Sequence, residues 1–80
     1  MSTQKLSNVS LDQLRRFLRK SGLEQSVVTK GRGGHEKWIK PGLTRPIVFQ
    51  SHIEPVPEFI MQQILRTLMV SKSAFFEAIK

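Results

Sequence analysis

The sequence predicts an α+β domain in which one helix precedes a three-stranded antiparallel sheet, a second helix follows the sheet, and a short helix ends the chain. Residues 10–22 combine a capping motif, an apolar stripe of helical period and a glycine stop. Residues 24–52 change to short runs of period two that glycine and proline separate, and residues 57–79 return to the helical period. Two helices that pack on one face of such a sheet leave its other face open to a ligand.

The first helix is expected to begin after Ser10. Ser10 and Gln13 have the spacing of a capping box, and Val9 and Leu14 occupy the positions of a hydrophobic staple. Gly22 can end the helix in the left-handed conformation. The apolar stripe on one side of this helix, which we expect to face the core, consists of Leu11, Leu14, Phe17 and Leu18.

The opposite side of the same helix is strongly basic. Its cations, which form i,i+4 pairs of like charge, are Arg15, Arg16, Arg19 and Lys20. Such pairs lower the stability of an isolated helix, so we predict that this side binds RNA phosphates or an acidic partner. A solvated face is the alternative, because cations near a helix C-terminus are also favourable.

Segments with β-branched or alternating sequences predict the strands. They are EQSVVTK (24–30), HEKWIK (35–40) and RPIVFQSH (45–52), separated by GRGG and PGLT. Pro41 and Gly42 suit a type II turn, and Pro46 requires a strand start or an edge position. The strands are therefore expected to form an antiparallel meander.

Two helices are expected after the sheet. Pro57 fits the first turn of the longer one. Its apolar stripe, which can lie across the sheet, consists of Ile60, Met61, Ile64, Leu65 and Leu68. Ser71 can cap the short last helix, with Val70 and Phe75 as its staple pair.

Composition limits the size and the partners of the protein. A chain of 80 residues with 39% hydrophobic content forms a single domain, residues 1–80, of which we expect residues 1–9 to be a flexible N-terminus. The chain has no cysteine and no apolar run near the ~20 residues of a membrane span, so we expect a soluble cytoplasmic protein without a membrane partner. A net charge of +7 favours a polyanionic partner such as nucleic acid or an acidic protein, although a basic surface can also serve solubility alone.

The loop KGRGGH, Lys30 to His35, carries the candidate reactive group. Trp38 is expected to face the helices, and side-chain alternation then puts His35, together with Lys37, on the open face. Glu36 points to the other face and is not assigned as a partner of His35. The residues expected to bind phosphate here, through glycine amides or side-chain charge, are Lys30, Arg32, Gly33, Gly34 and Lys37.

The chain resembles the HicA toxin family from Leu11 to Phe76. The likeness rests on the order of the elements, the KGRGGH loop, the aromatic residue three positions after His35, the histidine in VFQSH and the ILRTL helix. The resemblance implies a double-stranded-RNA-binding-domain-like fold, mRNA interferase activity with His35 as the catalytic residue, and neutralisation by a HicB antitoxin. Gly34 stands where the family usually has serine or threonine, and FQSH lacks the proline that is common in the family before this histidine. A divergent or less active member of the family is therefore an alternative.

RNA cleavage needs few protein groups. RNA carries its own nucleophile, the 2′-hydroxyl, so a base, an acid and positive charge near the phosphate suffice. His35 suits the base because an unperturbed histidine pKa of about 6.5 leaves much of it neutral at neutral pH. With no cysteine and only two histidines, the chain makes a poor metal site, so we predict a metal-independent endoribonuclease without a cofactor. His52 could assist as an acid or a substrate contact, or could only cap the strand end.

A catalytically silent RNA-binding module of the same fold is the alternative function, because the basic helix and loop could contact phosphates without chemistry. A DNA-binding regulator is less favoured, since helices that flank a sheet do not form a recognisable helix-turn-helix. Loss of His35 discriminates between the first two functions. A binding module tolerates that loss, whereas a nuclease does not.

Overall fold

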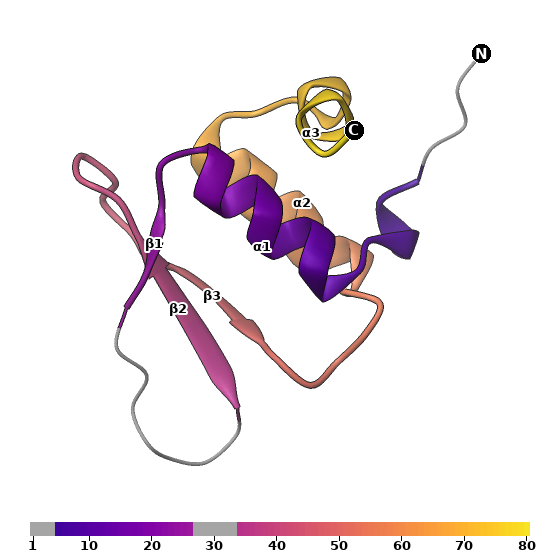
Figure 1. Ribbon diagram of the computed structural model, residues 1–80, viewed down its shortest axis with the longest axis horizontal. Helices are drawn as coiled ribbons and strands as arrows, with labels where there is room; N and C mark the ends of the chain where they lie inside the picture. The colour runs from indigo at the N-terminus through magenta and orange to yellow at the C-terminus, as the bar shows by residue number, and fades with distance from the viewer. Residues whose placement is uncertain (1–4, 27–33) are drawn as a thin grey trace.

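The computed structural model of the protein describes residues 5–26 and 34–80 and has the predicted α+β layout (Figure 1). A 3-10 helix, η1 (Leu6–Asn8), precedes helix α1 (Leu11–Lys20). The elements that follow are the strands β1 (Glu24–Gln25), β2 (His35–Ile39) and β3 (Ile47–Gln50), and the helices α2 (Glu58–Leu68) and α3 (Lys72–Ala78).

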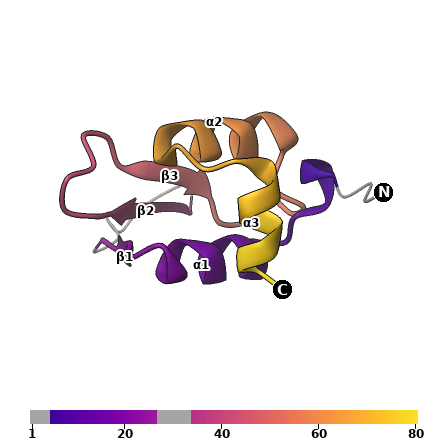
Figure 2. The ribbon, with the colours of Figure 1, turned by 90° about the horizontal axis from the view of Figure 1, so that it is seen from above.

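The strands form one antiparallel sheet in the order β1-β2-β3, as the predicted meander requires. Across β2 and β3, His35 pairs with Gln50 and Trp38 pairs with Ile47. Helices α1 and α2 lie on the same side of the sheet (Figure 1), and α3 lies across the pair when the molecule is seen from above (Figure 2). The other side of the sheet carries no helix among the described residues.

Helix α1 begins and ends as predicted. The Ser10 hydroxyl accepts a hydrogen bond from the Gln13 backbone at 3.1 Å, and the Gln13 side chain accepts one from the Ser10 backbone at 2.9 Å, which confirms the capping box. After the helix, Gly22 has a φ of +89°, a conformation that glycine adopts without steric cost. The predicted apolar stripe of Leu11, Leu14, Phe17 and Leu18 is buried. One face of α1 therefore lies in the core.

The N-terminal segment differs from the prediction that residues 1–9 are flexible. Leu6 and Val9 are only 5% and 1% exposed and belong to the core. The Val9 carbonyl also accepts a hydrogen bond from the backbone N–H of Val56 at 2.9 Å. Residues 5–9 are thus fixed by apolar burial and by a long-range backbone contact, while residues 1–4 lie outside the described residues.

The C-terminal helices follow the predicted pattern. Pro57 is the N-cap of α2 rather than a residue of its first turn, and the stripe predicted for α2 is buried or packed against the core. The Ser71 hydroxyl caps α3 by accepting a hydrogen bond from the Ala74 backbone at 3.1 Å. Phe75 of α3 meets Phe17 edge to face, with ring centroids 4.8 Å apart. Over the described residues, no helix has both the length and the apolar character that crossing a bilayer requires.

The strands are shorter than the segments that predicted them. β1 covers only Glu24–Gln25 of the expected 24–30, and positions 27–30 lie outside the described residues. β3 begins after Pro46, which has no N–H to donate to a neighbouring strand. The turn before it is as predicted, because Gly42 has a φ of +87° and the Leu43 N–H donates to the Lys40 carbonyl at 3.0 Å.

Candidate functional site

The residues of β2 alternate between two environments. Glu36 and Trp38 are buried against the helices, whereas His35, Lys37 and Ile39 are exposed on the open face. This confirms that His35 and Lys37 share the open face and that Trp38 and Glu36 point the other way. His35 is therefore free to meet a ligand, and its sequence neighbour Glu36 lies on the opposite side of the sheet.

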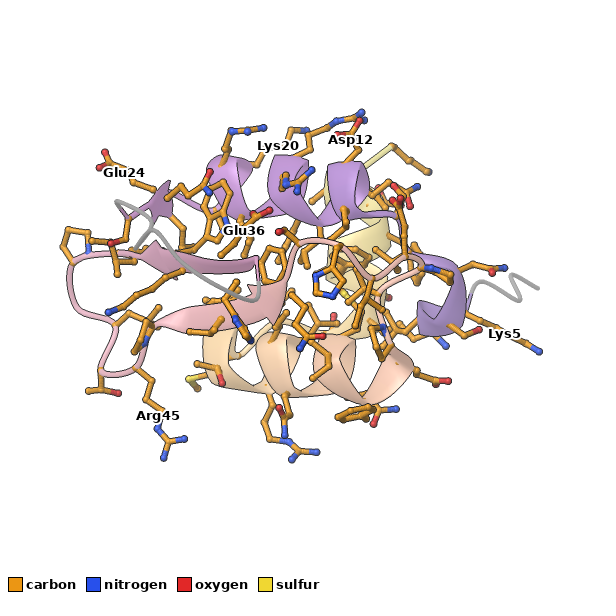
Figure 3. All side chains as sticks on the ribbon, turned by 90° about the horizontal axis from the view of Figure 1, so that it is seen from below. Lys5, Asp12, Lys20, Glu24, Glu36 and Arg45 are labelled. Atoms are coloured by element: carbon orange, nitrogen blue, oxygen red, sulfur yellow. The ribbon has the colours of Figure 1, made fainter. Side chains whose placement is uncertain are left out.

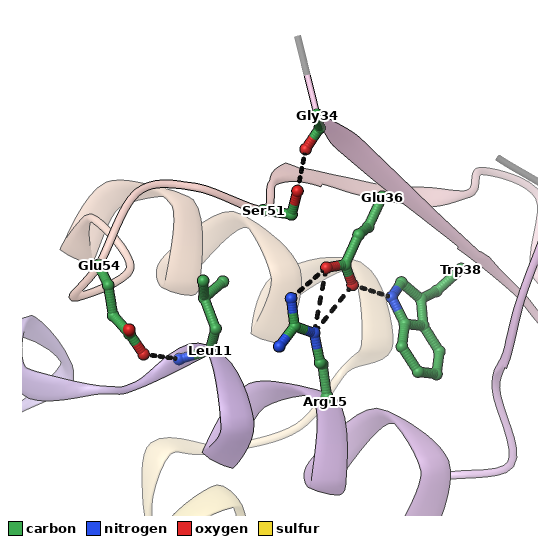
Figure 4. A network of polar contacts seen from close by, with 7 residues as sticks. All are labelled: Leu11, Arg15, Gly34, Glu36, Trp38, Ser51 and Glu54. Atoms are coloured by element: carbon green, nitrogen blue, oxygen red, sulfur yellow. Dashed lines mark hydrogen bonds and ion pairs between the residues drawn. The ribbon is translucent and has the colours of Figure 1, made fainter. Parts of the chain in front are cut away.

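Glu36 is held by charged and polar partners on the helix side (Figure 4). Arg15 Nε donates to its two carboxylate oxygens at 3.2 and 3.0 Å, Arg15 Nη2 forms an ion pair with Oε2, and Trp38 Nε1 donates to Oε1 at 3.1 Å. Burial acts to raise the pKa of Glu36, but the hydrogen bonds from Arg15 and Trp38 outweigh it, so the pKa is lowered. The Arg15–Glu36–Trp38 cluster is saturated with partners and is best explained as structural.

The cations on the basic side of α1, which were predicted to bind phosphates or an acidic partner, have different surroundings. Arg15 is directed at Glu36, and the guanidinium carbon of Arg19 lies 5.6 Å from the centroid of the Trp38 ring. Lys20 Nζ donates to the Ala78 carbonyl at 2.8 Å. Arg16 is exposed, which makes it the cation of this helix best placed to reach a separate molecule. Figure 3 shows Lys20 and Asp12 projecting from the outer side of α1, and Arg45 projecting on the other side of the molecule.

Gly34 joins the predicted loop to β2. Its φ is +52°, and its carbonyl accepts hydrogen bonds from the backbone N–H of Ser51, at 2.7 Å, and from the Ser51 hydroxyl. A Cβ atom at this position would lie 3.1 Å from Ser51 Oγ and 3.4 Å from His52 Nδ1. A serine or threonine here would be strained, so glycine suits this local structure. The other loop candidates, Lys30, Arg32 and Gly33, lie outside the described residues.

The sequence had suggested that His52 ends the third strand, but it does not. β3 ends at Gln50, and Ser51 and His52 form the turn that follows. The chain turns here because Ser51 bonds to Gly34, where β2 begins. His52 is exposed, and its Nδ1 is close to Gly34, the residue before His35. The fold thus brings the two histidines to the same end of the β2–β3 pair.

His35 lines a cavity that the sequence did not indicate. This cavity has a volume of about 410 Å³ and lies between β3 and the start of α2. Lining residues that the sequence analysis had not singled out include Val48, Gln50, Ile53 and Phe59. Phe59 is 63% exposed, which is unusual for a large apolar side chain and interrupts the helical pattern of α2. The one signal in the sequence was that Phe59 falls outside the apolar stripe predicted for this helix.

A second hollow of about 380 Å³ continues along β3 on the other side of Val48. Its lining includes Arg45 and Arg66, two cations that the sequence analysis did not select. Within residues 5–26 and 34–80, neither guanidinium takes part in an ion pair. Arg45 and Arg66 are 21 positions apart in the chain, so only the fold brings them to one site.

The exposed imidazole of the open face thus adjoins an apolar cavity between β3 and α2, and a basic hollow lies farther along β3. Within the part of the chain that the structure describes, His, Cys, Asp and Glu side chains do not gather in groups of three that could hold a metal ion. Lys37 is the cation that shares the exposed face of β2 with His35, whereas Arg45 and Arg66 lie on the other side of Val48. Comparison of the chain with protein-family models, with curated protein sequences and with solved structures found no match.

Proposed function

We propose that this protein is the toxin of a type II toxin–antitoxin system, a HicA-like mRNA interferase that cleaves RNA without a metal ion. The observation that carries the proposal is the position of His35, exposed on the open face of the sheet, at the edge of a cavity and next to Gly34. The α+β layout, with the helices on one side of the sheet, is compatible with the double-stranded-RNA-binding-domain-like fold that the HicA resemblance implies.

His35 acts as the general base in this proposal. Its neutral imidazole removes the proton of a ribose 2′-hydroxyl, and the resulting oxygen attacks the adjacent phosphorus. The P–O bond to the 5′-oxygen of the next nucleotide breaks, which leaves a 2′,3′-cyclic phosphate, and the departing oxygen takes a proton from an acid. His52 is a candidate for that acid because it lies at the same end of β2 and β3, and water is the other candidate.

Positive charge near the phosphate stabilises the developing negative charge. Lys37 is placed to contribute because it is exposed on the same face of β2 as His35. Lys30, Arg32 and the backbone of Gly33 and Gly34 remain predicted contacts to the same phosphate. On α1, Arg16 is a predicted contact to more distant phosphates, whereas Arg15, Arg19 and Lys20 also have partners within the protein.

The partner that silences the toxin is expected to be an acidic, HicB-like antitoxin. Such a protein would cover His35 and compete with phosphate for Lys37, Lys30 and Arg32, because its carboxylates attract the same cations. The net charge of +7 would speed its capture at low ionic strength. A complex in which His35 stays exposed would contradict this mode of inhibition.

Cleavage of a single-stranded RNA by purified protein in the presence of EDTA tests the proposal. We expect native protein to cleave with unchanged rate in EDTA, and His35→Ala to lose at least about a hundredfold, the lower end of the contribution of a general base. Gln62→Ala, at an exposed position of α2, is the matched control and should cleave like native protein. Loss of cleavage in EDTA, restored by a divalent ion, would contradict the metal-independent mechanism.

A silent RNA-binding module is the second candidate, and the Gly34 position favours it. Where the HicA family usually has a hydroxyl, this chain has a glycine whose surroundings leave little room for one. In that case His35→Ala would bind RNA like native protein, and expression of either form would leave growth and transcript integrity unchanged. Toxicity of native protein that His35→Ala removes would exclude the silent module.

A further inference from the structure

We infer that the cavity between β3 and α2 is a nucleobase-binding subsite. The base of a nucleotide next to the phosphate at His35 would leave its stack, enter the cavity against Phe59 and hydrogen-bond to the side chain of Gln50. The identity of the reacting phosphate rests on the proposed function. The cavity, its lining and the adjoining charges do not depend on it.

The lining of the cavity has the composition of a ligand site. Its volume of about 410 Å³ is within the usual range of small-molecule pockets. Three of the five large hydrophobic side chains that are exposed among the described residues lie here, namely Val48, Ile53 and Phe59. An apolar concentration of this kind on a strongly charged small protein is a marker of binding.

The polar group in the cavity is suited to reading a base. Gln50 is the cross-strand partner of His35, so the two side chains stand next to each other on the open face. An amide can donate and accept hydrogen bonds, as the edge of an unpaired base requires. Phe59 supplies a ring on which any base can stack. The cavity therefore offers stacking and edge recognition beside the proposed catalytic group.

The wall of the cavity is held in place before any ligand binds. Ile53 and Val56 belong to the segment between β3 and α2. That segment is tied to the N-terminal part of the chain, because Glu54 Oε2 accepts a hydrogen bond from the Leu11 N–H at 2.7 Å (Figure 4) and the Val56 N–H donates to the Val9 carbonyl at 2.9 Å. A preformed wall lowers the entropy cost of binding.

The basic hollow beyond Val48 extends the site to the RNA backbone. A strand whose base occupies the apolar cavity would place a neighbouring phosphate near Arg45 and Arg66, on the other side of Val48. Alternation of an apolar cavity and a cationic hollow along β3 matches the alternation of bases and phosphates in single-stranded RNA. An acidic peptide could use the arginines as well, but it would not need an exposed ring and an amide beside His35.

Binding of a short single-stranded RNA in which fluorine replaces each 2′-hydroxyl, so that it cannot be cleaved by this mechanism, tests the subsite. We expect Phe59→Ala to weaken binding by about 5- to 150-fold, the effect of losing one stacked base, and Phe59→Trp to retain it. Gln50→Ala should change the order of preference among the four homopolymers. Met69→Ala, at a side chain that is 90% exposed and lies outside the cavity, is the matched control.

An oligonucleotide with abasic positions separates base contacts from phosphate contacts. Native protein and Phe59→Ala should bind this oligonucleotide equally. Arg45→Ala and Arg66→Ala should bind it more weakly, and their affinity should depend less on salt concentration. Circular dichroism of each variant checks that it is folded. Equal RNA affinity of folded Phe59→Ala and native protein would overturn the subsite. A Phe59→Ala variant that binds RNA normally but no longer binds an acidic antitoxin would overturn it as well.

The subsite and the nuclease can fail separately. If native protein cleaves RNA and the Phe59→Ala variant binds RNA with unchanged affinity, the subsite is excluded and the proposed function stands. If native protein does not cleave RNA, but Phe59→Ala weakens RNA binding as expected, the nuclease activity is excluded and the subsite stands.

Discussion

The two faces of β2 place ionisable side chains in opposite surroundings. On the helix side, Glu36 is 5% exposed, and its carboxylate accepts hydrogen bonds from Arg15 and Trp38. On the open side, His35 and Lys37 are exposed, and His35 borders a cavity. A buried charge needs partners that satisfy it, and those partners leave it no capacity for a ligand. An exposed imidazole keeps that capacity.

The difference between the two faces separates charged groups that hold the fold together from those that can meet a ligand. Arg15 and Glu36 attract attention as a charged pair, but each satisfies the other and both contribute to the fold. His35 is a candidate for chemistry because it is exposed on the open face and borders a cavity. Removal of groups from the two faces should therefore separate stability from activity.

The largest effect on stability is expected from Glu36→Ala. It removes the acceptor of the partly buried Arg15 guanidinium and of the buried Trp38 N–H, and leaving such donors unsatisfied costs about 1–3 kcal/mol of unfolding free energy. Urea unfolding measures the cost. Glu24→Ala, at an exposed strand position, is the control and should stay within about 0.5 kcal/mol of native protein. A cost as small as that of the control would mean that the pair contributes little.

The pH dependence of stability should identify the Glu36 carboxylate. Its pKa is lower in the folded protein than in the unfolded chain, so its contribution is present above the unfolded value of about 4.3 and is lost as pH falls through the lower folded value. The stability advantage of native protein over Glu36→Gln should therefore shrink in acid. Urea unfolding of both proteins at about pH 6 and about pH 3 measures it. An advantage that grows in acid would contradict the lowered pKa.

A smaller effect is expected from Arg19→Ala, which removes the cation next to the Trp38 ring. A cation over an aromatic ring at an exposed site contributes about 0.5–1 kcal/mol. Arg16→Ala is the matched control, because Arg16 is exposed on the same helix. Thermal unfolding of both variants should show the lower midpoint for Arg19→Ala, and equal midpoints would mean that the contact is not stabilising.

The smallest effect on stability is expected from His35→Ala. The side chain is exposed and belongs to the open face, so its removal should change the unfolding free energy by no more than about 0.5 kcal/mol. The same variant is expected to lose RNA cleavage. If it unfolded more easily than Glu36→Ala, the distinction between the two faces of β2 would be wrong.

Local patterns predicted much of this fold. The Ser10 capping box, the Gly22 stop and the Ser71 cap depend on residues within a few positions of one another, and all three are present. Alternation in a single strand was enough to place His35 and Glu36 on opposite faces. These features need no knowledge of distant contacts.

The remaining features depend on contacts between distant segments. Arg15 was predicted to bind phosphate from its place on the basic side of the helix. Its partner Glu36 lies 21 positions away on β2, and helical periodicity gives no indication of that contact. The N-terminal segment was expected to be flexible because the burial of Leu6 depends on the folded core. The cavity at His35 requires β3, the segment after it and the first turn of α2 together. No single motif encodes such a site.

Trp38 is the only tryptophan of the chain, and it is 1% exposed on the helix side of the strand that carries His35. Its intrinsic fluorescence should shift to longer wavelength when unfolding admits water to the indole. A ligand on the open face contacts the opposite side of the strand and should leave the emission nearly unchanged. The protein therefore contains its own optical reporter, which can distinguish a variant that no longer binds from one that no longer folds.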